Sequence, residues 1–148
     1  MSYNTINKPI DILLVEDNPG DVFLITNSLS TSQMPNTLYH VTDGIEAMAF
    51  LRQENSYATV VRPHLILLDL NLPNKNGFEV LQEIKADPDL KHLPVVVLTS
   101  SRAEQDVLKS YRLYASCYIS KPFEVNEFDA AVRSIESFWL QRVQLPHK

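Results

Sequence analysis

Leu65-Ile-Leu-Leu-Asp-Leu-Asn-Leu-Pro73 is the stretch of sequence that decides the fold. Its first four residues form an uninterrupted apolar run, which is typical of a strand buried on both faces of a sheet. Similar runs occupy residues 10–15, 38–41 and 95–98, and a shorter one occupies residues 117–119. The sequence therefore predicts five short strands, of which the run at 38–41 is the weakest.

Between these runs the apolar residues change to helical spacing. Capping-box patterns at Asp43, Asn76 and Ser101 predict three helix starts. A further helix is predicted over residues 21–29, and a last one over 125–142 carries an apolar stripe with a 3.6-residue period. Strands that alternate with helices imply parallel pairing and helices on both faces. The predicted fold class is α/β, with a doubly wound, five-stranded parallel sheet.

Composition excludes several classes of function. The 148 residues carry a formal net charge of −5, which argues against nucleic-acid binding through a basic surface. Three widely spaced glycines fit neither a dinucleotide turn nor a phosphate loop, and the single cysteine excludes an internal disulfide. No apolar run approaches the ~18–20 residues of a membrane span, and the N-terminus lacks a signal-peptide pattern. We expect a single-domain cytoplasmic protein with neither DNA nor membrane as a partner.

Polar residues follow the predicted strands, at the sheet edge where doubly wound folds bind their ligands. They are Glu16, Asp17, Asp69, Thr99 and Lys121. Carboxylates ~4 Å apart repel by about 1 kcal/mol per pair in water and by about 4 kcal/mol at an effective dielectric constant of 20. Three carboxylates in one place therefore require a cation, and oxygen ligands favour Mg²⁺ over zinc.

A carboxylate beside Mg²⁺ and a lysine can also act as a nucleophile. Attack on a phosphoryl group would form an aspartyl phosphate, while the metal and the lysine neutralise its oxygens. Each residue taken singly has a structural alternative. Glu16 and Asp17 can cap the next helix, Thr99 can be a polar strand end, and Lys121 can be solvated. The combination favours phosphoryl chemistry.

The same residues lie in four motifs that resemble the response-regulator receiver domain of two-component signalling. These motifs are Leu13-Leu-Val-Glu-Asp-Asn18, Leu67-Leu-Asp-Leu-Asn-Leu-Pro73, Val97-Leu-Thr-Ser100 and Tyr118-Ile-Ser-Lys-Pro122. The resemblance implies a receiver domain over residues 9–142, between tails at 1–8 and 143–148. It also implies the strand order 2-1-3-4-5.

The resemblance assigns roles at the site. Asp69 corresponds to the phosphoacceptor, and Lys121 to the lysine that pairs with the phosphate. Glu16 and Asp17 correspond to the acidic pair that recruits Mg²⁺, and Asn71 to the residue whose main-chain carbonyl binds it.

Two further residues correspond to the family's conformational switch. Thr99 matches the hydroxyl that moves toward the phosphate, and Tyr118 matches the aromatic side chain that then swings inward. The alternative for Tyr118 is a half-exposed strand tyrosine. Tyr114 stands where the family usually has glycine, which leaves the turn geometry there open.

The resemblance implies a signalling switch rather than an enzyme that turns over a metabolite, with self-catalysed phosphotransfer and dephosphorylation only. A sensor histidine kinase would be the phosphoryl donor, and an unknown protein the downstream partner. The long segment at 54–63 and the ending Phe138-Trp-Leu…Leu145-Pro resemble the single-domain regulators of cyanobacterial phytochrome kinases. One alternative is a receiver-like binding module that accepts no phosphate. Another is a phosphatase of the haloacid dehalogenase type, which needs an acid where Asn71 stands.

The last predicted helix suggests self-association. Phe138, Trp139 and Leu140 are consecutive, so they cannot all face inward on a helix that turns 100° per residue. An apolar patch there would fit a symmetric homodimer. The alternative is that Trp139 closes the core and Leu140 is a single exposed leucine.

Overall fold

The computed structural model describes residues 9–31, 35–99, 117–121, 130 and 133. Strands and helices alternate along the chain from residue 10 to residue 99, and a further strand follows at 117–120. They are β1 (Ile10–Val15), α2 (Pro19–Ser30), β2 (Asn36–Val41), α3 (Gly44–Leu51), the 3₁₀ helix η1 (Asn55–Tyr57), β3 (Leu65–Asp69), α4 (Gly77–Ala86), β4 (Val95–Thr99) and β5 (Cys117–Ser120).

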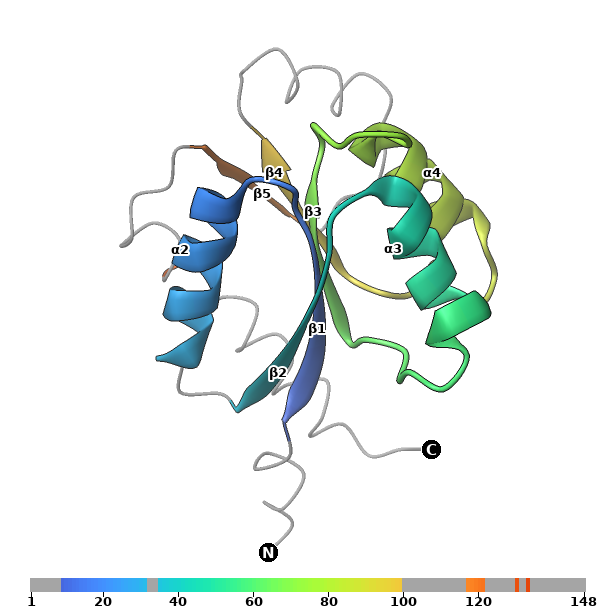
Figure 1. The fold of residues 1–148 in the computed structure, drawn as a ribbon, viewed down its shortest axis with the longest axis horizontal. Coiled ribbons are helices and arrows are strands. Elements are labelled where there is room, and N and C mark those ends of the chain that lie inside the picture. The colour runs from blue at the N-terminus through green and yellow to red at the C-terminus, as the bar shows by residue number, and fades with distance from the viewer. Residues whose placement is uncertain (1–8, 32–34, 100–116, 122–129, 131–132, 134–148) are drawn as a thin grey trace, which may run out of the picture.

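The strands form one parallel sheet in the order β2-β1-β3-β4-β5. Helix α2 covers one face of this sheet, and α3 and α4 cover the other (Figure 1). The predicted parallel sheet with helices on both faces is therefore confirmed. The helix start predicted at Ser101 lies outside the described residues, as does most of the helix predicted over 125–142, of which residues 130 and 133 are helical.

The two central strands are buried as their apolar runs predict. All five residues of β3 are buried, as are five of the six in β1. Alternate residues of these strands pack into two separate cores because successive side chains point to opposite faces. One core lies against α2 through Ile25 and Leu29, and the other lies against α3 and α4.

Strand β2 begins earlier than its apolar run. It starts at Asn36 rather than at Leu38, because Ile10 pairs with Asn36 and the Ile10 amide donates to the Pro35 carbonyl at 3.0 Å. Main-chain pairing of this kind needs no apolar side chain. β2 lies at the edge of the sheet and is only partly buried, which explains its weak pattern.

The helix starts follow the predicted caps, with one difference. Asn76 forms a complete capping box with Glu79 at the start of α4. Asp43 caps α3 by accepting from the Glu46 amide at 2.8 Å, but the Glu46 carboxylate accepts a hydrogen bond from the Tyr57 hydroxyl. The second half of the box predicted at Asp43 is thus replaced by a contact to η1.

The segment predicted as an irregular loop at 54–63 contains this short helix. Gln53 and Asn55 adopt left-handed backbone angles around its start (φ 56° and 55°), and the Tyr57 ring packs against Phe50 at a centroid distance of 5.3 Å. The segment is therefore an ordered part of the fold, tied to α3.

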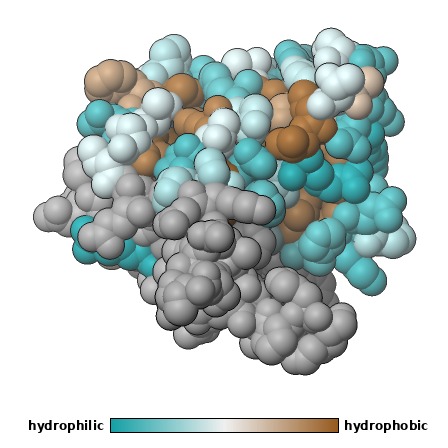
Figure 2. Space-filling view, turned by 90° about the horizontal axis from the view of Figure 1, so that it is seen from below, coloured by the Kyte–Doolittle hydropathy of each residue, from teal (hydrophilic) through white to brown (hydrophobic). Residues whose placement is uncertain are grey.

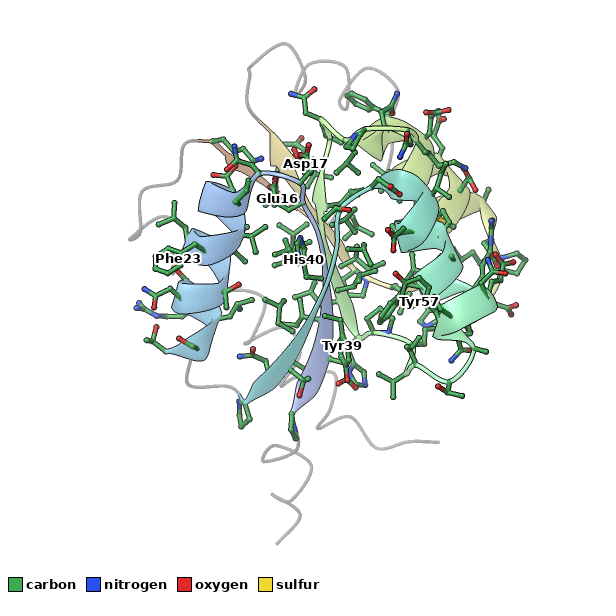
Figure 3. All side chains as sticks on the ribbon, in the orientation of Figure 1. Glu16, Asp17, Phe23, Tyr39, His40 and Tyr57 are labelled. Atoms are coloured by element: carbon green, nitrogen blue, oxygen red, sulfur yellow. The ribbon has the colours of Figure 1, made fainter. Side chains whose placement is uncertain are left out.

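The surface carries exposed apolar residues in several places. Phe23 on α2 projects away from the sheet and is 69% exposed (Figure 3). On the face seen in Figure 2, hydrophobic residues are interspersed among hydrophilic ones outside the grey region. Among the described residues, no helix has the length and apolar character needed to cross a bilayer.

Candidate phosphoacceptor and metal site

Three acidic residues meet at the carboxyl end of the two central strands. Glu16 and Asp17 directly follow β1, and both lie at its end in Figure 3, while Asp69 is the last residue of β3. Val15 of β1 pairs with Leu68 of β3, so the residues that follow this pair come out side by side. Parallel pairing thus brings together carboxylates that lie more than fifty residues apart in the sequence.

The three carboxylates form a compact group of unequal exposure. One oxygen from each of Glu16, Asp17 and Asp69 lies within 4.8 Å of the others. Glu16 and Asp69 are buried, with 0% and 2% of their surface exposed, whereas Asp17 is exposed. Because the Asp17 carboxylate is exposed and the other two are buried, solvent can reach the cluster from the side of Asp17.

Lys121 supplies the positive charge. Its Nζ lies 2.8 Å from Oε1 of Glu16 and 3.4 Å from Oδ1 of Asp69. A third carboxylate, that of Asp21 in the first turn of α2, lies 2.9 Å from the same Nζ. Burial lowers the pKa of Lys121, but its close contacts with the carboxylates of Glu16 and Asp21 and the charge of Asp69 outweigh this effect and raise that pKa above its ordinary value. Lys121 is therefore a permanent cation at this site.

Glu16 occupies the least favourable position for a carboxylate. Burial raises the pKa of Glu16 to about 7, with Lys121 opposing the rise and Asp69 adding to it. Oε2 accepts from the Asn18 amide at 3.2 Å, whereas Oε1 has the Lys121 ion pair but no well-formed hydrogen bond among the described residues. Each oxygen of Glu16 thus already faces a protein group.

The loop after β3 holds Asp69 in place. The Asn71 amide donates to Oδ1 of Asp69 at 3.1 Å, and the Gly77 amide donates to the Leu70 carbonyl at 3.1 Å. A Cβ atom on Gly77 would lie 2.3 Å from the Asp69 carbonyl oxygen, closer than any real contact. Glycine is required at this position because the start of α4 packs directly on the backbone of the acceptor strand.

A second tie joins this loop to α3. The Asn74 side chain donates to Oδ2 of Asp43 at 2.9 Å, and Asn74 has a left-handed backbone (φ 66°). Gly44 allows the Lys75 carbonyl to approach, since a Cβ there would lie 2.1 Å from that oxygen. The loop that contains Asn71 is therefore fixed at both ends.

The donor set fits a hard divalent cation. The described residues place four carboxylates beside one ammonium: Glu16, Asp17 and Asp69 form one group, and Nζ of Lys121 contacts Glu16, Asp69 and Asp21. This excess of negative charge favours a cation, and ligands that are all oxygen favour ions such as Mg²⁺ or Mn²⁺. The predicted site for a divalent metal is supported at this level.

The structure brings together most of the predicted site residues. Glu16, Asp17, Asp69 and Lys121 meet, and Asn71 adjoins them. The Thr99 backbone lies one residue beyond Leu98, which pairs with Asp69, but its side chain lies outside what is described. Phe138, Trp139, Leu140 and the turn at Tyr114 lie outside the described residues altogether.

Two further residues bear on the site, Tyr118 as the predicted switch residue and Asp21 as a contact of Lys121. Tyr118 on β5 has 37% of its surface exposed, an outward position. The sequence alone does not predict Asp21 as a site residue, because its place in the first turn of α2 is fully explained by helix formation. No local pattern marks Asp21 as a site residue, because its contact with Lys121 joins the first turn of α2 to the residue that follows β5.

A buried strand-end carboxylate beside an ammonium and a divalent-metal site is equipped for phosphoryl transfer to the carboxylate itself. Comparison with protein families matches residues 12–133 to the response regulator receiver domain. The chain belongs to the response regulator receiver family.

Individual relatives make the placement more specific. The chain is 51% identical over 140 residues to response regulator Rcp1 of Synechocystis sp., covering 95% of both chains. Among solved structures it resembles the phosphorylated cyanobacterial phytochrome response regulator RcpA, with a TM-score of 0.80, 51% identity, and coverage of 95% and 100% of the two chains. It also resembles the Mn²⁺-bound form of Rcp1, with a TM-score of 0.79, 51% identity, and coverage of 94% and 100%. The chain is thus a response regulator similar to those that serve phytochromes.

Proposed function

We propose that the chain accepts a phosphoryl group on Asp69 from a sensor histidine kinase of the phytochrome type and signals through the resulting change in shape. One observation carries this proposal. The Asp69 carboxylate, 2% exposed at the end of β3, lies 3.4 Å from Lys121 and in the same cluster as two further carboxylates. The similarity to RcpA, which is named a cyanobacterial phytochrome response regulator, supports the kinase class.

In the proposed reaction, a carboxylate oxygen of Asp69 forms a bond to phosphorus. The bond from phosphorus to the donor's imidazole nitrogen breaks, and its electron pair stays on that nitrogen. Lys121 offsets negative charge on the phosphoryl oxygens. The Asn71 amide holds the carboxylate oriented during the attack. A separate step would end the signal without any other enzyme: water attacks phosphorus, the bond from phosphorus to the Asp69 oxygen breaks, and inorganic phosphate leaves while the carboxylate is restored.

The proposed metal is Mg²⁺, held by the carboxylates of Asp17 and Asp69 and the main-chain carbonyl of Asn71, with Glu16 acting through water. When bound, the metal neutralises charge on the phosphoryl oxygens. The exposed Asp17 is the natural direct ligand, because both oxygens of Glu16 already face Lys121 and the Asn18 amide.

The proposed switch couples Thr99 to Tyr118. Phosphate on Asp69 would draw the Thr99 hydroxyl inward and let the outward Tyr118 follow. Moving an equilibrium from 1:99 to 99:1 takes ~5.5 kcal/mol of differential interaction. Charge-assisted hydrogen bonds from Lys121, Thr99 and a backbone amide could supply it, because bonds of this kind contribute ~1.5–3 kcal/mol each and about 2 kcal/mol from each of the three is enough.

We further propose that residues 9–142 complete the five-fold strand–helix repeat, with short tails at 1–8 and 143–148, in a cytoplasmic protein. The signal would pass to a downstream protein that binds the surface altered by the switch.

Phe138, Trp139 and Leu140 would form part of a homodimer surface. Sedimentation with and without a phosphate analogue tests the dimer, since removal of residues 138–148 should abolish it.

Incubation with labelled acetyl phosphate and Mg²⁺ tests the proposed activity. A phosphoacceptor gains a label that stays on the protein long enough to be detected. A phosphatase releases phosphate steadily, and a binding module does neither. Transfer from a phosphorylated phytochrome kinase, and none from an unrelated histidine kinase, would support the kinase class.

A further inference from the structure

Lys121 divides its contacts unequally among three carboxylates. Its Nζ is 2.8 Å from Glu16 and 2.9 Å from Asp21, but 3.4 Å from Asp69. The two shorter contacts both lead to the β1–α2 segment. In this state the ammonium is therefore held mainly by that segment and only secondarily by the proposed acceptor.

Asp21 is free to act as a counter-ion. Its main-chain amide caps α2 by donating to Oδ1 of Asn18 at 3.0 Å, so the capping role uses the backbone and not the carboxylate. Its side chain is only 20% exposed, and that of Lys121 is 13% exposed. The pair is thus shielded from solvent more than an ordinary surface ion pair, whose contribution is close to zero. Asp21 is also absent from the three-carboxylate group that suits a cation among the described residues.

We propose that Asp21 is a positioning residue that holds Lys121 back from Asp69 in the unphosphorylated state and so weakens retention of the phosphoryl group. This inference rests on the proposed function, because it concerns how strongly the same site keeps its phosphate. When a phosphoryl group arrives, Lys121 must exchange the Asp21 contact for a contact to the new oxygens. Because the Asp21 contact is lost in this exchange, a stronger Asp21 contact makes the phosphorylated state less stable relative to the unphosphorylated one.

The test is a titration with beryllium trifluoride, a phosphoryl analogue, at saturating Mg²⁺, followed by calorimetry on the full chain. Asp21→Asn removes the charge and nearly keeps the shape, and we expect it to bind the analogue about three- to tenfold more tightly than wild type. Asp21→Glu keeps the charge and should return the affinity toward the wild-type value. Asp21→Ser repeats the loss of charge should the Asn variant fold poorly. Glu54→Gln, an exposed carboxylate on the segment after α3, is the control for net charge alone.

Removal of the Asp21 charge also makes the electrostatic potential of the whole site more positive, which would favour binding of the anionic analogue without any role for Lys121. The role of Lys121 therefore needs its own measurement. The Asp21→Asn gain should vanish in a Lys121→Gln background, because the competition then has no ammonium to act on. Independently, the Lys121 Nζ resonance of the free Asp21→Asn variant should move toward its position in the analogue-bound wild type.

Three results would overturn the inference: unchanged or weaker analogue binding by Asp21→Asn, an equal gain in the Lys121→Gln background, or an unmoved Nζ resonance. Failure of the proposed function looks different. In that case wild type would not bind the analogue at all, or Asp69→Asn would bind it as well as wild type does.

Discussion

The main-chain amide of Asn71 donates a hydrogen bond of 3.1 Å to Oδ1 of Asp69, so the residue proposed to lend its carbonyl to the metal also orients the acceptor carboxylate. A single short loop therefore controls both halves of the site. Any change that shifts this loop should alter metal binding and phosphorylation together.

Gly77→Ala should damage the fold and the site at once. The added Cβ would lie 2.3 Å from the Asp69 carbonyl oxygen and 2.5 Å from the Leu70 Cα, and the backbone at the end of β3 and just after it cannot move aside cheaply. We expect a loss of about 1–3 kcal/mol in the free energy of unfolding, measured in urea, together with slower phosphorylation. Gly20→Ala is the matched control, because its Cβ would meet only the Asn18 side chain at 3.2 Å. Equal stability of the two variants would contradict the packing argument.

Two substitutions at Asn74 separate its hydrogen bond from its backbone angle. Asn74→Gly keeps access to the left-handed conformation but loses the bond to Asp43, and should cost about 0.5–1.5 kcal/mol of unfolding free energy. Asn74→Ala should cost about 1 kcal/mol more, because alanine is strained at a φ of 66°. Chemical denaturation measures both. A glycine variant as stable as wild type would show that the tie to α3 contributes nothing.

Glu16 should make stability depend on pH in the direction opposite to a carboxylate whose pKa is lowered by an ion pair. Burial raises the pKa of Glu16 from 4.5 to about 7, so the folded state favours its protonated form. Its contribution to stability is complete below the unfolded pKa and is lost as the pH rises from 4.5 through about 7.

Glu16→Gln cannot ionise, so the difference in unfolding free energy between wild type and this variant isolates the effect. Without metal, the unfolding free energy of wild type should fall relative to that of the variant as the pH rises from about 5 to about 8. Mg²⁺ should restore part of it at the higher pH, because it binds the ionised form. A difference that is constant with pH would mean that Glu16 titrates normally in the fold.

The two acidic residues after β1 should differ as metal ligands. Asp17 is exposed, and its carboxylate has no hydrogen bond or ion pair within the described part of the chain, whereas both oxygens of Glu16 face protein groups. We expect Asp17→Asn to weaken Mg²⁺ binding by about tenfold or more, and Glu16→Gln to weaken it less. Calorimetric titration of Mg²⁺ gives both constants, with Glu54→Gln as the control. The reverse order would assign the direct ligand to Glu16.

Much of this site was predictable because the fold places strand ends together. Apolar runs mark β1 and β3 as central strands, and parallel pairing then puts Glu16, Asp17 and Asp69 at one edge without knowledge of any side-chain contact. Lys121 follows from the same rule at the end of β5.

The features of the site that the sequence does not reveal are contacts between residues of different helices, strands and loops. The contact of Asp21 with Lys121 joins the start of α2 to the end of β5, and no local pattern encodes that distance. Likewise, Asn74 and Gly77 look like ordinary turn residues, because the atoms that constrain them belong to Asp43 and Asp69 elsewhere in the chain.

The central claim is that Asp69 is the phosphoacceptor, and intact-protein mass spectrometry after incubation with acetyl phosphate and Mg²⁺ tests it most directly. Wild type should gain the mass of one phosphoryl group, and so should Asp89→Asn, which alters an exposed aspartate remote from the site. Asp69→Asn should gain none, and omission of Mg²⁺ should suppress the gain in wild type. An Asp69→Asn protein that gains one phosphoryl mass at a rate comparable to wild type would contradict the account.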